Sequence, residues 1–521
     1  MAVTGLNAIV IGGGHNGLVC AAYLAKAGMK VLVLERSDQV GGACVTQELV
    51  PGFRFSTFAY GAHGPGPKIC SELEVPADAF PLATPDPALV QLFPDHDRVV
   101  LWQDAELTKR ELARFSLHDA RSYDGYRDFC RRALVICEDF LLQDPPDPLE
   151  LTRKWTDHQH AEVLDILLHG SLWDAICRYF EHEKVCMAFA RADDAGPTNY
   201  PGSALAEFVE SASSGVGINN QCGLLRDGMG RITQVLAERV RAYGGAIRCN
   251  AHVARILVDH GTAAGVELET GERLLATLVV SNADPKRTFL KLLDPASLDP
   301  EFRRSVSQIT TRASYMKFLA VLSEPPRFLA LPEAERENPK FAASARILPS
   351  LSYLEKSWQN CISGRLPQNP ALSLQLPTAY WPSQAPSGKH IFGAWVRWAP
   401  SRLADGSSWD ARREEMTGRL LTLMDTYAPG FSDSVEWRKL YTPTDIERET
   451  GITDASIRHV DMTLDQMLNR RPLPRWCQYQ SPVKGLWLCG SGTHPCGSVT
   501  GAPGHNCASA ILRSNAENPR A

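Results

Sequence analysis

The cysteines of this 521-residue sequence never occur in the close pairs that metal sites and dithiol centres use. None of the 14 cysteines forms a Cys-x-x-Cys pair, so neither a zinc site nor a Cys-x-x-Cys redox motif is indicated. So many unpaired cysteines are typical of proteins from a reducing compartment.

Long apolar runs and an excess of positive charge are also missing. No apolar run approaches the length that a bilayer requires, and the first strand pattern begins too early to leave room for a signal peptide. The net charge is −5, without the excess of positive charge that is typical of nucleic-acid-binding proteins, so no nucleic-acid partner is expected. We expect a soluble, intracellular, cytoplasmic protein; peripheral contact with a membrane and homo-oligomer formation are left open.

The beginning of the chain has the pattern strand, glycine turn, helix. Residues 8–11 form a short apolar run, as a strand buried on both faces should. Gly12, Gly14 and Gly17 follow as Gly-x-Gly-x-x-Gly. Gly12 allows the tight turn, Gly14 lets a pyrophosphate approach the backbone, and Gly17 lets the next helix lie close to the strand. The N-terminus of that helix would face the phosphates.

A second predicted strand, residues 31–34, ends at Glu35. A carboxylate at this position can accept hydrogen bonds from both hydroxyls of an adenosine ribose. Because the glycine motif has a strand before it, a helix after it and this acid beyond it, the stretch indicates a dinucleotide site.

Arg36 and the pair Gly41-Gly42 extend the motif. Together with Gly12 to Gly17 and Glu35, they resemble the FAD-binding start of the flavoprotein group that includes amine oxidases and phytoene desaturases. The resemblance implies FAD as the cofactor, with backbone N–H groups of the second turn at the pyrophosphate and Arg36 over the adenine end.

Cys44 separates this sequence from the flavin disulfide reductases. Those enzymes follow the glycine pair with two cysteines close together, whereas here Cys44 stands alone and Leu49 lies five positions on. No second Gly-x-Gly-x-x-Gly occurs in a strand–turn–helix setting. Cys44 is therefore interpreted as a small buried residue rather than a redox thiol.

The C-terminal region repeats the strand, turn and helix pattern. Residues 485–490 read as a strand, 491–500 as a tight polar loop and 501–512 as the start of a helix. This is similar to the phytoene desaturase-like FAD-dependent oxidoreductases, in which such a segment closes the flavin site. The resemblance implies that the helix N-terminus faces flavin N1 and C2=O. It also implies that small residues of the turn contact the flavin, namely Gly490, Gly492, Gly501 and Ala502. The backbone of Val253, on another predicted strand, would contact the adenine.

The length predicts more than one domain. The resemblance implies an α/β fold with a discontinuous Rossmann-type FAD-binding domain at residues 1–75, 218–290 and 480–521. Residues 76–217 and 291–479 would form a mixed α+β substrate domain.

Within the expected substrate domain, residues 119–142 and 157–180 read as helical. The second stretch has an apolar residue at every fourth position, which is typical of a core-facing helix; a channel wall or a membrane-dipping face is the alternative. Residues 313–322, 350–355 and 389–398 read as strands.

Two residues are candidates for catalysis. His63 lies in a loop that should pass near the flavin, as a proton donor or acceptor or as a hydrogen-bonded loop histidine. The amine oxidases of this group have a lysine that hydrogen-bonds through water to flavin N5, and Lys317 is the candidate for this role. The alternative is that Lys317 faces the solvent. His494 and His505 are expected to serve hydrogen bonding. No metal site is predicted.

The sequence has Phe55-Ser56-Thr57-Phe58 where carotene desaturases have Phe-Asp-x-Gly, which argues against a carotenoid substrate.

The predicted reaction is removal of hydride from a C–H or C–N bond of an apolar or amphipathic small molecule. Flavin N5 would accept the hydride, and oxygen or a quinone would re-oxidise the flavin. Two other classes stay open: a non-redox flavoenzyme, such as an isomerase or hydratase that uses reduced FAD, and a binding or assembly protein that holds FAD without turnover.

Overall fold

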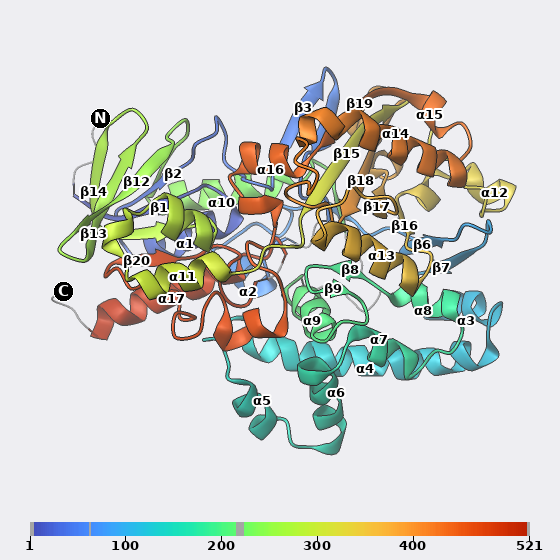
Figure 1. The fold of residues 1–521 in the computed structure, drawn as a ribbon, viewed down its shortest axis with the longest axis horizontal. Helices are drawn as coiled ribbons and strands as arrows, with labels where there is room; N and C mark the ends of the chain where they lie inside the picture. Colours follow the sequence, from blue (N-terminus) through green and yellow to red (C-terminus); the bar gives the residue numbers. More distant parts are fainter. Residues whose placement is uncertain (1–4, 62–63, 215–222, 497, 518–521) are drawn as a thin grey trace.

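A computed structural model describes residues 5–61, 64–214, 223–496 and 498–517, and Figure 1 shows the fold. Within these residues, two seven-stranded sheets lie in different halves of the molecule. One sheet is mainly parallel and the other mainly antiparallel, and helices cover both. This is the α/β fold with a second mixed α+β unit that the sequence predicts.

The first sheet has a parallel core with an antiparallel extension. Its parallel strands, in spatial order, are β11 (Ala246–Arg248), β2 (Val31–Leu34), β1 (Leu6–Ile11), β14 (Arg273–Ser281) and β20 (Leu486–Leu488). The first half of β14 continues instead into an antiparallel meander with β13 (Thr262–Leu268) and β12 (Val253–Asp259). Three widely separated parts of the sequence therefore share one sheet.

Both faces of this sheet are buried, which explains the continuous apolar runs of its parallel strands. On one face, α1 (His15–Lys26) packs between α10 (Gly230–Ala242) and α17 (Ala502–Glu517). Ala8 and Val10 of β1 face this helical layer, whereas Ile9 and Ile11 belong to the core on the other face. The helix α11 (Pro300–Gln308) supplies Phe302 and Val306 to that second core.

The second sheet is antiparallel except where β16 and β6 run parallel. Its order is β19 (Val435–Tyr441), β15 (Tyr315–Leu322), β18 (His390–Arg397), β17 (Ala371–Gln375), β16 (Ser344–Ile347), β6 (Leu89–Leu92) and β7 (Arg98–Leu101). The long helix α14 (Trp409–Tyr427) packs its buried side chains against one face of this sheet.

The strand predicted at 350–355 was wrong, because this segment begins the helix α13 (Leu351–Ile362). The Ser350 hydroxyl caps the helix by accepting a hydrogen bond from the N–H of Tyr353 at 3.2 Å. Leu354, Trp358 and Cys361 then fall on one buried face. The cap and the helical spacing decide the structure of this short stretch.

Helices form a separate block beside the second sheet (Figure 1). They are α3 (Ala105–Ala113), α4 (Leu117–Leu141), α5 (Pro148–Lys154), α6 (His158–His169), α7 (Leu172–Cys177), α8 (Glu183–Phe189) and α9 (Ser203–Ser214). The helical stretch predicted at 157–180 is broken after Gly170, where Ser171 and Asp174 form a reciprocal capping box that starts α7. The apolar residues spaced by four are nevertheless buried in one core, as the core interpretation predicted: Leu164, Leu168, Leu172, Ile176 and Phe180.

Short elements connect these layers. They are α2 (Pro67–Glu72), α12 (Glu333–Arg336), α15 (Phe431–Ser434), α16 (Pro443–Thr450) and the two-stranded pairs β3 (Thr46–Val50) with β4 (Phe53–Ser56), β5 (Leu82–Ala83) with β10 (Leu224–Leu225), and β8 (Ala192–Asp193) with β9 (Gly196–Pro197). Among the helices described, none has the length and apolar character needed to cross a membrane.

Candidate active site

A cavity lies at the carboxyl ends of β1 and β2, where the two glycine turns meet. The N–H of Gly41 donates to the carbonyl of Gly13 at 2.9 Å, which holds the turns side by side. The structure brings to this cavity seven residues that the sequence singled out: Gly12, Gly14, Glu35, Arg36, Gly41, Gly42 and Val253.

The glycines of the first turn are required by close approaches of the backbone. Gly12 has φ +93°, a conformation that disfavours other residues. A Cβ atom on Gly14 would lie 2.8 Å from the Asn282 side-chain amide, and one on Gly17 would lie 2.3 Å from the Gly12 carbonyl oxygen. Gly17 does not line the cavity; it lets α1 approach the turn, as predicted.

Glu35 and Arg36 lie at the far end of β2. The buried Glu35 carboxylate accepts hydrogen bonds from the N–H groups of Gly13 at 2.8 Å and Ser37 at 2.9 Å, one on each oxygen. Each oxygen retains acceptor capacity that can receive a ribose hydroxyl. Arg36 donates to the Arg448 carbonyl at 2.7 Å, and burial together with the nearby Arg287 lowers its pKa.

Three buried polar atoms on the cavity wall have no hydrogen-bond partner among the described residues. They are His15 Nε2, Asn16 Oδ1 and His459 Nδ1. Burial lowers the pKa of His15 to about 3 and that of His459 to about 4, so both imidazoles are neutral at pH 7. Because buried polar atoms almost always find partners, a ligand that supplies donors and acceptors fits this cavity, as FAD would.

His15 and Asn16 were not singled out from the sequence. They occupy the variable positions between Gly14 and Gly17, directly at the N-terminus of α1, and this position could have identified them. Asn16 also donates to the Ser491 hydroxyl at 3.2 Å, which connects the first glycine motif with the C-terminal turn.

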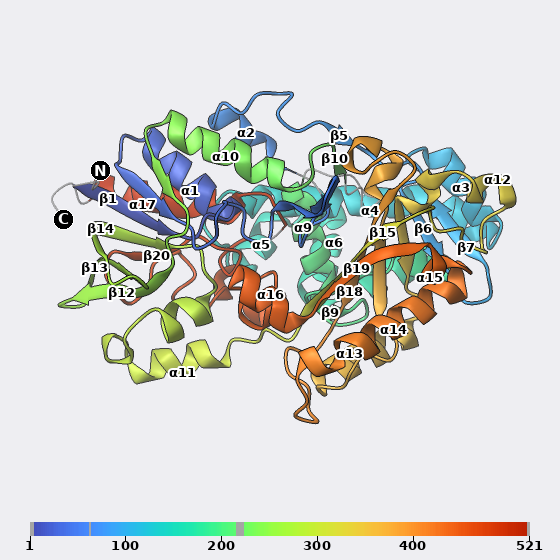
Figure 2. The ribbon, with the colours of Figure 1, turned by 90° about the horizontal axis from the view of Figure 1, so that it is seen from above.

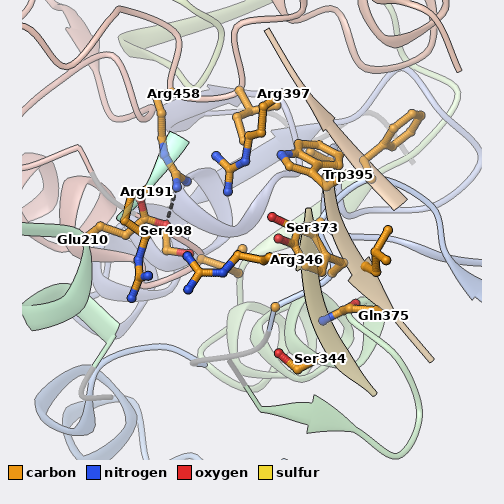
Figure 3. A pocket seen from close by; sticks show the side chains of 18 of the residues that line it. Arg191, Glu210, Ser344, Arg346, Ser373, Gln375, Trp395, Arg397, Arg458 and Ser498 are labelled. Atoms are coloured by element: carbon orange, nitrogen blue, oxygen red, sulfur yellow. Dashed lines mark hydrogen bonds and ion pairs between the residues drawn. The ribbon is translucent and has the colours of Figure 1, made fainter. Parts of the chain in front are cut away.

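A second, larger chamber continues from the dinucleotide cavity and reaches the second sheet (Figure 3). His15, Ala43, Ile457 and Ser491 line both spaces. The chamber wall combines apolar side chains with four arginines and two glutamates, Glu207 and Glu210. The apolar members include Phe58, Leu89, Leu348, Leu374, Trp395 and Val499, and the arginines are Arg191, Arg346, Arg397 and Arg458.

Cys44 lines this chamber as a buried free thiol. Its Sγ donates to the carbonyl of Met229 at 3.1 Å, and burial raises its pKa. The uncharged thiol is a poor nucleophile, which agrees with the interpretation of Cys44 as a small buried residue.

Lys317 is buried, with 2% of its surface exposed, so the solvent-facing alternative was wrong. Its Nζ lies 4.3 Å from the ring centre of Tyr60 and 5.3 Å from that of Trp395. These two rings line the chamber, whereas Lys317 lines a smaller neighbouring cavity that also includes Tyr60. Burial lowers the pKa of Lys317 to about 7. The other catalytic candidate, His63, lies outside the described residues.

His494 and His505 serve hydrogen bonding, as expected. His494 Nε2 pairs with the Phe140 carbonyl at 3.0 Å, and His505 Nδ1 pairs with the Asn506 side-chain oxygen at 2.8 Å.

The C-terminal turn contributes Ser491, Ser498 and Val499 to the chamber wall. Its glycines allow close packing against the protein: a Cβ atom would lie 2.8 Å from the Asn282 carbonyl oxygen at Gly490 and 2.6 Å from Pro285 at Gly492. Neither of the two cavities is lined by Gly490, Gly492, Gly501 or Ala502, so their contact with the flavin stays a prediction.

Arg471 connects the C-terminal turn with the segment that carries His459. Its fully buried guanidinium donates to the carbonyl of Ser491 at 2.8 Å. It also donates to the carbonyls of Arg458 at 2.7 Å and Val460 at 3.1 Å. No feature of the sequence indicated this role.

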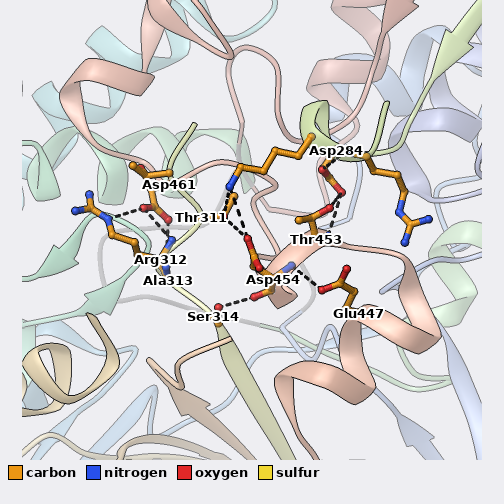
Figure 4. A network of polar contacts seen from close by, with 12 residues as sticks. Asp284, Thr311, Arg312, Ala313, Ser314, Glu447, Thr453, Asp454 and Asp461 are labelled. Atoms are coloured by element: carbon orange, nitrogen blue, oxygen red, sulfur yellow. Dashed lines mark hydrogen bonds and ion pairs between the residues drawn. The ribbon is translucent and has the colours of Figure 1, made fainter. Parts of the chain in front are cut away.

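A polar network holds residues 447–461 between the two sheets (Figure 4). Asp284, just beyond β14, accepts hydrogen bonds from the N–H and the hydroxyl of Thr453 at 3.0 and 2.8 Å. Asp461 accepts from the N–H groups of Arg312 and Ala313, both at 3.1 Å, in the segment that leads into β15. The network therefore places Ile457, Arg458 and His459 where the two cavities meet.

A Rossmann-type sheet with a double glycine turn, joined to a second sheet across a chamber, defines a dinucleotide-dependent α/β enzyme. The family described as flavin containing amine oxidoreductase matches residues 17–511, and the chain belongs to it. The protein is an FAD-dependent oxidoreductase, as the sequence resemblance implied.

Named relatives support this assignment. The chain is 30% identical to pyridine nucleotide-disulfide oxidoreductase domain-containing protein 2 of Rattus norvegicus, over 97% of this chain and 93% of that protein. It is 26% identical to the neurosporene-forming phytoene desaturase of Cereibacter sphaeroides, over 95% and 92% of the two chains. An oxidoreductase structure from Methanosarcina mazei shares the fold, with a TM-score of 0.59, 17% identity and coverage of 98% of this chain and 100% of that chain.

Proposed function

We propose that this enzyme oxidises an amphipathic small molecule by removing hydride from a C–H or C–N bond. The observation that carries the proposal is the chamber that continues directly from the dinucleotide cavity and has a mixed apolar and charged wall. Bound FAD would supply the hydride acceptor, and oxygen or a quinone would regenerate it.

We propose that the dinucleotide cavity holds FAD through the residues identified from the sequence. The Glu35 carboxylate would accept hydrogen bonds from the ribose hydroxyls, and the backbone N–H groups of the two glycine turns would face the pyrophosphate. The orphaned His15, Asn16 and His459 atoms would complete the hydrogen bonding. The full proposed set is Gly12, Gly14, Gly17, Glu35, Arg36, Gly41, Gly42, Val253, Gly490, Gly492, Gly501 and Ala502, with His15, Asn16 and His459 added.

The remaining roles follow from position. The apolar wall would exclude water from the reacting bond, and Cys44 would stay a neutral thiol. His63 stays our candidate proton donor or acceptor, and Lys317 stays our candidate for the lysine that hydrogen-bonds through water to flavin N5. Because burial lowers the pKa of Lys317 to about 7, its uncharged form is also suited to accept a proton. We also propose the domain division 1–75, 218–290 and 480–521 against 76–217 and 291–479, and a cytoplasmic location based on the unpaired cysteines.

The test uses the purified protein and its visible spectrum. We expect bound flavin that absorbs at about 450 nm and that loses this absorbance when an amphipathic substrate is added without oxygen. Re-oxidation by air or by an added quinone then identifies the acceptor. Turnover that appears only after chemical reduction of the flavin would favour an isomerase or hydratase. Flavin that no substrate reduces would favour a binding or assembly role.

A further inference from the structure

Four arginine side chains enter the chamber from different elements (Figure 3). Two of them have carboxylate partners. Arg191 Nε lies 3.3 Å from a carboxylate oxygen of Glu207, and Arg458 pairs with Asp194 at 3.3 Å and with Glu210. The local charges of Arg191 and Arg458 are thereby balanced within the protein.

Arg346 and Arg397 differ from this pair. In the part of the chain that the structure describes, neither guanidinium has a carboxylate within ion-pair distance. Arg346 is 4% exposed and donates only to the carbonyls of Ala190 at 2.8 Å and Ala188 at 2.7 Å, while its buried Nε has no partner. Arg397 is half-buried, donates to the Tyr315 hydroxyl at 3.3 Å and lies over that ring. Burial alone would lower its pKa, but Tyr315, Tyr60 and the more distant carboxylates of Asp194 and Glu210 raise the pKa of Arg397.

The buried Arg346 guanidinium is unfavourable without a counter-ion, because carbonyl dipoles replace only part of its hydration. An oxyanion bound in the chamber would supply the missing negative charge next to Arg346. Arginine suits this purpose, since its planar fork binds two oxygens of one oxyanion.

The strand register gathers the polar groups on one wall. Arg346 of β16 lies directly opposite Ser373 of β17, and Ser373 lies opposite Trp395 of β18. Residues that face each other across neighbouring strands project from the same face of a sheet, and all three line the chamber. The hydroxyl of Ser373 and the indole face of Trp395 therefore border the space next to Arg346.

The FAD phosphates are not the anion that this wall fits. Arg346 and Arg397 line the chamber and not the dinucleotide cavity, which has its own arginines, Arg36 and Arg287, and the N-terminus of α1. Arg346 lies on β16 and Arg397 on β18, so both belong to the second sheet, whereas the glycine turns follow strands of the first sheet.

We propose that the substrate carries an oxyanion head group, a carboxylate or a phosphate ester, that Arg346 and Arg397 bind together. The apolar wall then receives the body of the molecule, including the bond that is oxidised. This inference rests on the proposed function of the same chamber and narrows its substrate class from amphipathic to anionic amphipathic molecules.

The experiment measures binding of four probes to the FAD-loaded enzyme: octanoate, octyl phosphate, octanol and octylamine. Binding is followed by the change in the flavin spectrum and by the thermal unfolding midpoint. We expect at least one of the two anions to bind at least about tenfold more tightly than octanol and octylamine, since hydrogen bonds to a charged group discriminate by this order. The comparison of octanoate with octyl phosphate identifies the preferred oxyanion.

Arg346→Met and Arg397→Met should each weaken binding of the anion by about tenfold to a hundredfold and leave binding of octanol unchanged. Arg402→Met, at an exposed arginine, is the matched control. The flavin content of every variant is measured in parallel. If one variant fails to fold, the other carries the test.

The inference is overturned if octanol binds as tightly as both anions, or if the folded variants retain full affinity for the anion. Failure of the proposed function gives a different result. In that case the protein either lacks flavin or holds flavin that no substrate reduces, and the thermal shift with octanoate still reports on the two arginines.

Discussion

The backbone N–H of Gly13 donates a hydrogen bond of 2.8 Å to the Glu35 carboxylate. This bond joins the turn after β1 to the end of β2, and the N–H of Ser37 holds the other carboxylate oxygen at 2.9 Å. The acid proposed to bind the ribose is therefore fixed by the protein itself. Such preorganisation lowers the entropic cost of binding a flexible dinucleotide.

Replacement of Glu35 tests this arrangement. We expect Glu35→Arg to retain less than about a tenth of the wild-type flavin, because it removes the ribose acceptors and leaves two backbone donors unpaired in a buried site. Flavin content is measured from visible absorbance per chain. Glu238→Arg, at an exposed position of α10, is the control. A Glu35→Arg protein with full flavin content would show that the adenosine lies elsewhere.

Arg471 offers a test of the cavity wall distant from the glycine motif. We expect Arg471→Met to lower the free energy of unfolding by about 3 kcal/mol or more, because several buried carbonyls lose their donor together. Calorimetry of the apoprotein should show a lower midpoint, and flavin retention should fall because His459 and Ser491 lose their common support. The neighbouring, exposed Arg470→Met should change neither quantity. If the two variants unfold at the same midpoint, Arg471 does not have this positioning role.

The buried histidines predict an acid limit of stability. Burial lowers the pKa of His494 from 6.5 to about 4. The unfolded chain therefore binds a proton below pH 6.5 that the folded chain excludes until about pH 4. Stability is full above pH 6.5 and falls as the pH decreases towards 4, by up to about 1.4 kcal/mol per pH unit for this group. His494→Gln should flatten the dependence of the melting temperature in this window. His169→Gln, on the exposed end of α6, should not alter it.

Burial of Lys317, like that of His494, makes the folded protein less stable as the pH decreases, but in a higher pH range. Its pKa falls from 10.5 to about 7 because the amine is buried, and it has no hydrogen bond or ion pair with the described residues. The unfolded lysine stays protonated up to pH 10.5, so wild-type stability increases from pH 7 towards 10.5. We expect Lys317→Met to raise the melting temperature at pH 7.5 and to lose this advantage towards pH 10. Lys340→Met controls for an exposed lysine. If the difference in melting temperature between Lys317→Met and the wild type stays constant from pH 7.5 to pH 10, the amine is charged in the folded protein. The Tyr60 and Trp395 rings would then stabilise it.

The helical boundaries show where local patterns were insufficient. The periodicity of residues 157–180 correctly predicted the buried face, but not the break at Gly170 and Ser171, because the capping box depends on the side-chain bonds of Ser171 and Asp174. At 350–355 the apolar pattern was too short to separate a strand from the first turns of α13.

The sequence by itself determined the dinucleotide half of the site. Turn, strand end and helix start are local structures, so residues within about 40 positions of each other, at Gly12, Glu35 and Gly41, specify them together. The family, the cofactor and the α/β fold followed from this stretch and the C-terminal turn.

Only the tertiary structure decided what the chamber offers to a substrate. Arg346 and Arg397 lie on strands separated by β17, and their lack of a carboxylate partner depends on how the second sheet packs against the helical block. Likewise, the burial of Lys317 and the support that Arg471 gives to the cavity wall arise from contacts between segments distant in sequence. No spacing of residue types along the chain encodes such contacts, because the fold sets those distances only when the chain has packed.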